Sequence, residues 1–275
     1  MKINFDNLVI EIGRDCNMSP PCRHCLRGFP QKKTIGNKVL DKFFSQVNYI
    51  SELTIGGGEP TLYLKTIRKL ISKALENDVE IGNFYIVTNA KLYKRKLINI
   101  CDLLYGTDED GFNGICTENE ISGLSISDDK FHRERHENIE KFLYNKHKYQ
   151  FKDEYENESR PYVRKDKETD FSKFSIINMG MAKKNGIGNR ELNIYLPYKE
   201  MWDDEIVVRD IELYLTYDGR LLSCCDLSYD IIDSNEYTIG DIMTEELLSI
   251  IQKLPNVNDE HDFKKYWKGG NKNDI

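Results

Sequence analysis

Residues 16–25 read CNMSPPCRHC and place three cysteines within ten positions. This run directly follows residues 8–12, an apolar stretch typical of a buried strand. Thiolates are soft ligands that select iron–sulfur clusters, zinc or cuprous ion. A structural zinc site requires a fourth ligand, and the only nearby candidate, His24, lies in a turn too tight for all four groups to converge easily. The spacing therefore favours an iron–sulfur site on Cys16, Cys22 and Cys25, in which a four-iron cluster keeps one iron open for a substrate.

The bulk composition is that of a folded globular protein, with 39% hydrophobic and 31% charged residues among 275. A net charge of −7 gives no reason to expect nucleic-acid binding. No apolar run reaches the length of a membrane span, so no membrane partner is expected. The first residues are polar, and an odd number of cysteines, seven, argues against a disulfide framework. These features predict a cytoplasmic protein with reduced or metal-bound thiols.

Strands and helices are expected to alternate along the first two thirds of the chain, which predicts a parallel sheet with right-handed crossovers. Apolar runs predict strands over residues 8–12, 53–55, 84–87, 121–127 and 174–179. Helical spacing of apolar residues predicts helices over residues 39–50, 64–74 and 97–104. Residues 145–170 are dense in charged residues without clear periodicity, and we expect them to form a solvated insertion.

The pattern changes after residue 193. Residues 206–208, 211–216 and 221–224 predict antiparallel strands, with a hairpin turn at Tyr217-Asp218-Gly219-Arg220. A last helix is expected over residues 244–254. We therefore predict two domains, a core over residues 1–200 and a smaller extension over residues 201–275.

Polar and glycine-rich segments follow several of the predicted strands. Gly56-Gly57-Gly58-Glu59-Pro60 follows the second strand, Thr88-Asn89 follows the third, and Ser125 and Ser127 end the fourth. In a parallel β/α barrel the loops that follow strands lie at the same mouth, which is the active face. Alternate residues of a strand share a face, so Ser125 and Ser127 can both point into the barrel. We expect these groups to meet the three-cysteine loop.

Together, the cysteine loop and the segment Gly57-Gly58-Glu59-Pro60 resemble the radical SAM superfamily. Members place a three-cysteine loop after the first strand of a partial β/α barrel and a Gly-Gly-Glu-Pro motif after the second. Asn17 and His24 also agree with the loop of that family. One departure is the spacing of the cysteines, with five residues and then two between them, where three and then two are usual. The resemblance covers about residues 5–182.

The resemblance implies an α/β fold, a partial (β/α)6-type parallel barrel with a small C-terminal α+β extension. It implies that Cys16, Cys22 and Cys25 hold a [4Fe-4S] cluster whose fourth iron binds S-adenosylmethionine. Reduction then cleaves S-adenosylmethionine to a 5′-deoxyadenosyl radical, which abstracts hydrogen from a peptide or small-molecule substrate. A reduced flavodoxin or ferredoxin is the implied electron donor. The implied cofactor-binding residues are Gly56, Gly57, Gly58, Glu59, Thr88, Asn89, Ser125, Ser127 and His24.

Cys224 and Cys225 lie in a region that resembles the SPASM or twitch extension of that family. No cysteine follows Cys225, so a complete second cluster lacks ligands. One of the pair is a candidate hydrogen-atom donor to a substrate radical; the alternative is that both are half-buried structural thiols. For the whole chain, the alternative to an enzyme is a non-catalytic iron–sulfur or zinc protein with a structural or redox-sensing role.

Overall fold

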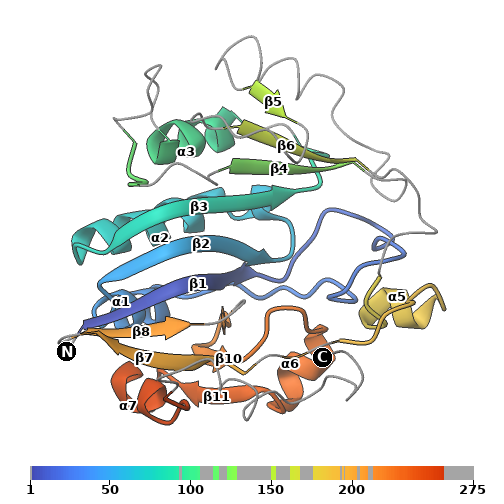
Figure 1. Ribbon diagram of the computed structural model, residues 1–275. Helices are drawn as coiled ribbons and strands as arrows, with labels where there is room; N and C mark the ends of the chain where they lie inside the picture. The colour runs from blue at the N-terminus through green and yellow to red at the C-terminus, as the bar shows by residue number, and fades with distance from the viewer. Residues whose placement is uncertain are drawn as a thin grey trace.

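The computed structural model describes residues 2–92, 95–105, 114–117, 123–128, 150–152, 162–167, 176–192, 194, 196–202, 205–209 and 213–256. Its described strands join one mixed sheet (Figure 1). They are β1 (Lys2–Gly13), β2 (Tyr49–Gly57), β3 (Glu80–Thr88), β4 (Gly123–Asp128), β5 (Gln150–Lys152), β6 (Tyr162–Lys167), β7 (Tyr198–Trp202), β8 (Glu205–Arg209), β9 (Leu213–Leu215), β10 (Arg220–Leu222) and β11 (Thr238–Asp241). The helices are α1 (Asn37–Phe44), the 3-10 turn η1 (Pro60–Leu62), α2 (Leu64–Glu76), α3 (Arg95–Tyr105), α5 (Gly180–Lys184), α6 (Tyr229–Ser234) and α7 (Leu247–Gln252).

The long strand β1 lies at the centre of the sheet. On one side of it follow β2, β3, β4, β6 and β5, all parallel. On its other side β8 and β9 are both parallel to it, while β10 and β11 continue the sheet in antiparallel order. The sheet is open, because β5 and β11 form its two edges. The prediction of an α/β fold with a six-strand parallel core is confirmed.

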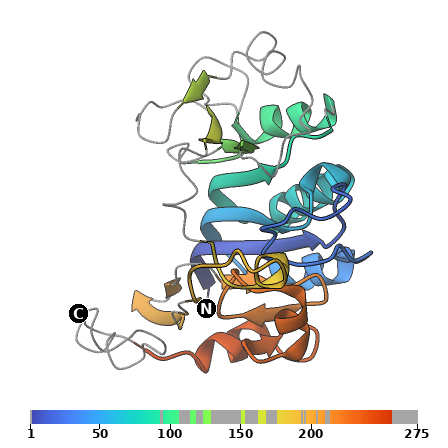
Figure 2. The same ribbon diagram turned by 90° about the vertical axis from the view of Figure 1, so that its right-hand side faces the viewer.

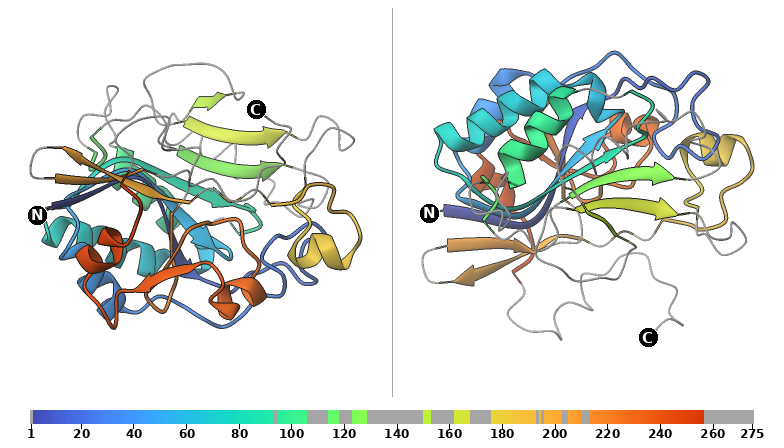
Figure 3. Two further views of the ribbon diagram at one scale, coloured as in Figure 1. Left: turned by 60° about the horizontal axis from the view of Figure 1, so that its bottom comes forward. Right: turned by 90° about the horizontal axis from the view of Figure 1, so that it is seen from above.

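The two faces of β1 belong to two different hydrophobic cores. Leu8, Ile10 and Ile12 face one core, which also buries the apolar stripes of α1 and α2. Figures 2 and 3 show α1, α2 and α3 covering this face of the sheet. Val9 faces a second core together with Tyr214 of β9. This alternation follows from the two-residue period of a strand, and it places Tyr229 and Ile232 of α6 in the same core as Val9.

Several local expectations differ from the structure. The helix predicted over residues 39–50 ends at Phe44, and Ile50 belongs to β2, because its side chain is buried on the sheet instead. The expected insertion at residues 145–170 contains β5 and β6, whose backbones extend the parallel sheet beyond β4. No strand is found over the described residues 176–179, where Ile177 makes only an isolated bridge to Arg190. β6 occupies the place in the sheet that was expected for that strand.

The C-terminal strands also pair differently from the expectation of a purely antiparallel unit. β8 is antiparallel to β7 but parallel to β1. β9 is parallel to β1 and forms the predicted hairpin with β10, where Leu215 pairs with Leu221. The domain boundary at residue 200 stays a prediction; β7 spans it, and strands on both sides share one sheet. None of the described helices is both long and apolar enough to span a membrane.

Candidate active site

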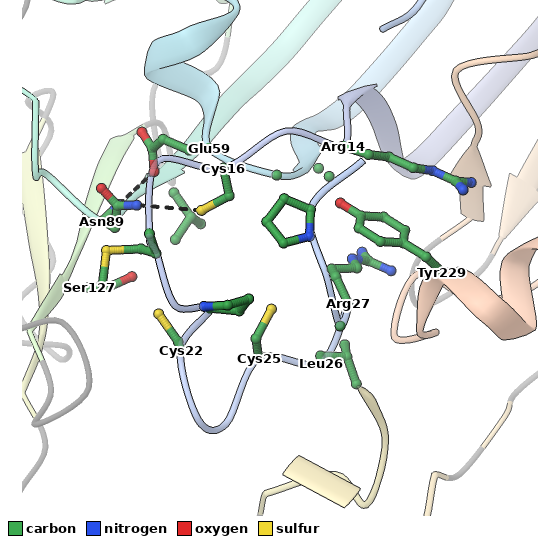
Figure 4. A pocket seen from close by; sticks show the side chains of 18 of the residues that line it. Arg14, Cys16, Cys22, Cys25, Leu26, Arg27, Glu59, Asn89, Ser127 and Tyr229 are labelled. Atoms are coloured by element: carbon green, nitrogen blue, oxygen red, sulfur yellow. Dashed lines mark hydrogen bonds between the residues drawn. The ribbon is translucent and has the colours of Figure 1, made fainter. Parts of the chain in front are cut away.

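The loop after β1 brings three thiols to one cavity. Cys16, Cys22 and Cys25 are half-buried and line a cavity of about 410 Å³ at the carboxyl ends of β1 to β4. Figure 4 shows their sulfur atoms turned toward a common space. The backbone N–H of Cys25 donates to the carbonyl of Cys22 at 3.0 Å, which closes the turn between the last two cysteines. The predicted convergence of the cysteine loop with the ends of the neighbouring strands is thus observed.

The protein surrounds these thiols with a dry environment and backbone donors. Burial raises the pKa of Cys16 to about 11 and also raises the pKa of Cys25. Against this, the N–H of Met18 donates to the Cys16 sulfur, and those of Arg27 and Gly28 donate to the Cys25 sulfur. Such donors stabilise the thiolate form. The raised pKa values favour the protonated thiols of Cys16 and Cys25 in the absence of metal, and binding of a metal would release these protons.

The donor set distinguishes between kinds of metal site. Among the described residues, no group of three His, Cys, Asp or Glu side chains is placed to hold one metal ion. A tetrahedral zinc with Zn–S bonds of about 2.3 Å needs its sulfur ligands about 3.8 Å apart. In an iron–sulfur cluster each thiolate binds a different iron, so the sulfurs lie farther apart. Three thiols around a shared cavity therefore fit a cluster better than a single zinc ion.

One wall of the cavity is made by the glycine run and the end of β3. The glycines are required by close backbone contact: a methyl group at Gly58 would lie 2.0 Å from the carbonyl oxygen of Asp15. Gly57 has φ of +106°, and a methyl group there would lie 2.1 Å from the oxygen of Gly13. This closeness allows the Gly58 N–H to donate to Gly13 at 2.7 Å and the Glu59 N–H to donate to Asp15 at 2.9 Å. We call residues 56–59 with Thr88 and Asn89 the glycine wall.

The carboxylate of Glu59 organises the glycine wall. It is 3% exposed and accepts hydrogen bonds from the Thr61 N–H (3.0 Å), the Thr61 hydroxyl (2.6 Å), the Thr88 hydroxyl (2.6 Å) and the Asn89 N–H (2.9 Å). The side chains of Glu59 and Thr88 therefore form hydrogen bonds within the chain. The role of Glu59 and Thr88 in cofactor binding stays a prediction. In that role the two side chains would hold the backbone that contacts the cofactor.

Asn89 connects the glycine wall to the cysteine loop. Its amide nitrogen donates to Asn17 Oδ1 at 2.8 Å and lies 3.9 Å from the Cys16 sulfur (Figure 4). Its side-chain oxygen accepts from the Lys91 N–H at 3.0 Å, which fixes the orientation of the amide.

Ser127 and His24 also line the cavity. Ser125 pairs in register with Val87, and its side chain lies outside the described part of the chain.

The opposite wall combines Cys225, a candidate from the sequence, with Arg27 and Tyr229, which sequence reasoning did not select. Figure 4 shows Arg27 and Tyr229 on the other side of the cysteine sulfurs from Asn89. Cys225 lines the cavity as well. We call Arg27, Cys225 and Tyr229 the arginine wall. Tyr229 is 3% exposed, and its hydroxyl has no hydrogen-bond partner among the described residues.

A buried arginine supports the arginine wall from behind. Arg14 is fully buried and binds Glu11, also fully buried, at 2.7 Å and Asp233 of α6 at 2.7 Å. Its guanidinium lies over the rings of Tyr217, at 4.8 Å, and Tyr229, at 4.6 Å. Burial opposes the charge, yet the hydrogen bonds and charges of Glu11 and Asp233 raise the pKa of Arg14 above its ordinary value. This network joins the end of β1 to the C-terminal segments.

Three solved structures with a similar architecture contain anSMEcpe with bound AdoMet. Native anSMEcpe with bound AdoMet and the Cp18Cys peptide matches with a TM-score of 0.51 and 13% identity, over 98% of this chain and 84% of that chain. His-tagged anSMEcpe with AdoMet (TM-score 0.50, 12% identity, 98% and 81%) and native anSMEcpe with AdoMet (0.50, 12%, 97% and 84%) match similarly. The chain has the fold of the radical SAM enzymes. No family model and no curated protein matches the sequence.

Within this radical SAM fold the two adjacent cysteines of the C-terminal segment are not equivalent. Cys225 is 7% exposed and lines the cavity. Cys224 is half-buried, does not belong to the described cavity lining, and its sulfur accepts from the Asp226 N–H at 3.3 Å. Of the two candidates for a hydrogen-atom donor, Cys225 alone is thus placed beside the cysteine loop. The role itself stays a prediction.

Of the three residues that sequence reasoning missed, Arg14 and Arg27 carry weak signals in the sequence. Arg27 follows Cys25 by two positions, and its closeness to the cysteines could have identified it. Arg14 follows the first strand directly and precedes Cys16 by two positions. Tyr229 has no such local signal, because only the tertiary fold brings α6 to the loop.

Proposed function

We propose that the chain is a radical SAM enzyme that acts on a peptide or small-molecule substrate. One observation carries this proposal: three thiols and a glycine-rich strand end line the same cavity, in a chain with the fold of the radical SAM enzymes. In the proposal Cys16, Cys22 and Cys25 hold a [4Fe-4S] cluster. When bound, that cluster would supply the electron that cleaves S-adenosylmethionine to a 5′-deoxyadenosyl radical for hydrogen abstraction.

The residues of this chain would bind and orient the cofactor. The glycine wall would present its backbone to S-adenosylmethionine, because no side chain at residues 56–58 blocks close approach. Asn89, Ser127 and His24 would complete the contacts, since all three line the cavity. We also include Ser125 among the proposed cofactor-binding residues because it lies in β4, the strand that carries Ser127. The side chains of the opposite wall would exclude water from the reacting atoms by filling the space beside them.

Room for a substrate is the second element of the proposal. A further cavity of about 530 Å³ shares Arg27, Gly28 and Tyr229 with the cavity of the thiols. A substrate could enter there and reach the cofactor past the arginine wall. One of the structures with the same fold holds the Cp18Cys peptide, which favours a peptide for this chain as well. The proposed electron donor is a reduced flavodoxin or ferredoxin in the cytoplasm.

Anaerobic reconstitution with iron and sulfide tests the proposal. We expect about four irons per chain, and formation of 5′-deoxyadenosine from S-adenosylmethionine after a reductant is added. Replacement of Cys22 by Ala should abolish both, whereas Cys101→Ala, a buried core cysteine on α3, should retain the iron. A protein that holds the cluster but forms no 5′-deoxyadenosine would instead support the non-catalytic alternative, and a colourless zinc protein would contradict the cluster.

We also propose that Cys225 donates the hydrogen atom that quenches a substrate radical. Its S–H bond would break, the substrate would gain a C–H bond, and the thiyl radical would be restored by one electron from the reduced flavodoxin or ferredoxin and one proton. The Cys225→Ala variant is expected to form 5′-deoxyadenosine but almost no substrate product. Cys224→Ala is the matched control and should keep its product yield. Unchanged product formation in Cys225→Ala would contradict the role.

A further inference from the structure

Arg27 lines the cavity and carries a charge that no described carboxylate contacts directly. No described Asp or Glu forms an ion pair with this guanidinium, in contrast to Arg14, which binds both Glu11 and Asp233. Its contacts are a hydrogen bond of 2.6 Å to the carbonyl of Leu227 and a stacking contact over the ring of Tyr214 at 4.8 Å. An arginine stays charged even when buried. The remaining N–H donors of Arg27 are therefore available to an anionic ligand.

The phenol of Tyr229 supplies a second group at the same place. Tyr229 and Arg27 both line the cavity of the thiols and the adjoining cavity. The Tyr229 hydroxyl is buried and has no partner among the described residues, although buried hydroxyls normally make a hydrogen bond. In Figure 4 this hydroxyl lies on the side of the Tyr229 ring that faces Cys16. A ligand that accepts hydrogen bonds would satisfy both Tyr229 and Arg27.

We propose that Arg27 and Tyr229 bind a carboxylate group of the substrate. A carboxylate has one charge and two oxygens, which match one guanidinium and one hydroxyl. A phosphate carries about −1.5 to −2 charges and would need more cations, but the other arginine of the cavity, Arg14, is already neutralised. This inference rests on the proposed function, because the carboxylate belongs to the molecule on which that site acts.

The position of the pair assigns the carboxylate to the substrate and not to S-adenosylmethionine. The proposed cofactor-binding groups of the glycine wall line only the cavity of the thiols, whereas Arg27 and Tyr229 lie where the two cavities meet. A ligand bound there would extend from the second cavity toward the cysteine loop. Arg27 and Tyr229 are thus specificity-determining residues: they favour acids over the corresponding amides.

Acetate, with acetamide as its neutral counterpart, is a direct probe. Each is titrated by ligand-detected NMR into the anaerobically purified protein saturated with S-adenosylmethionine, without reductant. We expect acetate but not acetamide to bind. Arg27→Gln should weaken acetate binding at least about tenfold and Tyr229→Phe several-fold, because each removes a hydrogen bond to a charged group. Arg23→Gln is the matched control, since Arg23 is an exposed arginine of the same loop outside the described cavity lining.

The dissociation constant of S-adenosylmethionine and the iron content are measured for the same variants. The inference predicts that Arg27→Gln leaves both unchanged. If Arg27→Gln weakened the binding of S-adenosylmethionine as much as that of acetate, Arg27 would belong to the cofactor site and the inference would be overturned. The inference would also be overturned if the unmodified protein did not bind acetate, or if Arg27→Gln did not change acetate binding. The 5′-deoxyadenosine assay reports on the proposed function separately, so a failure of one is distinguishable from a failure of the other.

Discussion

The two walls of the cavity are built on opposite principles. In the glycine wall the carboxylate of Glu59 accepts four hydrogen bonds from groups of the chain itself. In the arginine wall, Arg27 donates to the carbonyl of Leu227 but forms no ion pair with a described Asp or Glu, and the hydroxyl of Tyr229 has no described hydrogen-bond partner. A wall that is satisfied internally suits an invariant cofactor. A wall with unused donors suits a substrate that brings its own acceptors.

The walls also depend on different kinds of contact for their stability. The glycine wall is held by close backbone approach between Gly58 and Asp15, at the ends of neighbouring segments. The arginine wall is held by the buried ion pair of Arg14 and Glu11 and by Asp233. The first contact tolerates no added volume, and the second tolerates no unpaired charge. Substitutions can therefore damage each wall separately.

The largest expected effect is the loss of Arg14. Arg14→Met leaves the carboxylate of Glu11 buried without its cation, which costs about 3–5 kcal/mol of unfolding free energy. It also removes the cation that lies over Tyr229. Denaturant unfolding measures the cost. Arg209→Met is the matched control: Arg209 pairs with Asp6 at 2.8 Å near the surface, and its loss should cost no more than about 1 kcal/mol.

A second variant separates lost charge pairing from lost packing at Arg14. In the double variant Glu11→Met/Arg14→Met no unpaired charge is buried, so part of the stability should return. The recovery is incomplete because the Tyr217 N–H, which donates to Glu11 at 3.0 Å, loses its acceptor. If Arg14→Met costs no more than Arg209→Met, the buried pair does not hold the arginine wall.

The next effect concerns the glycine wall. Gly58→Ala places a methyl group 2.0 Å from the carbonyl oxygen of Asp15, so the end of β2 and the cysteine loop must separate. We expect a loss of about 3 kcal/mol or more and poor iron retention after reconstitution. Gly36→Ala is the control, because nothing lies within 4 Å of a methyl group there; this helix-cap position should lose at most about 1 kcal/mol. Normal iron content in Gly58→Ala would show that the close approach is dispensable.

The difference between the walls also explains which of them the sequence could predict. The cysteine loop and the glycine run are short local patterns at strand ends, and parallel strands bring such ends together. Arg27 and Leu227, in contrast, are 200 positions apart and meet only because β9 adds to β1 and turns Tyr214 toward the second core. The charged sequence of β6 shows no two-residue alternation, so no strand was predicted there. Ile50 continues the helical spacing of the preceding apolar residues by chance, so the helix was predicted to be too long. Local patterns thus predicted the cysteine loop and the glycine wall, and tertiary contacts determined the rest.

The smallest expected effect on stability is that of Glu59→Gln. The glutamine oxygen can replace the carboxylate oxygen that Thr61 and Thr88 contact, but its NH2 group then faces the Asn89 N–H, which donates at 2.9 Å in the native protein. An unsatisfied buried donor costs about 1–3 kcal/mol, and removal of a buried charge offsets part of it. We expect a net loss of about 1 kcal/mol, with a larger relative effect on iron retention because Asn89 holds Asn17 beside Cys16.

Glu52→Gln is the matched control for that substitution, since Glu52 is a half-buried carboxylate on the same strand, β2, with only a 3.4 Å contact from Thr54. Iron release to a chelator, followed in both variants, separates a local change in the glycine wall from general destabilisation. Faster release in Glu59→Gln at similar unfolding free energy would show that the glutamate acts on the cysteine loop through Asn89. Equal release from the two variants would mean that the cysteine loop keeps its shape without help from the hydrogen bonds of Glu59.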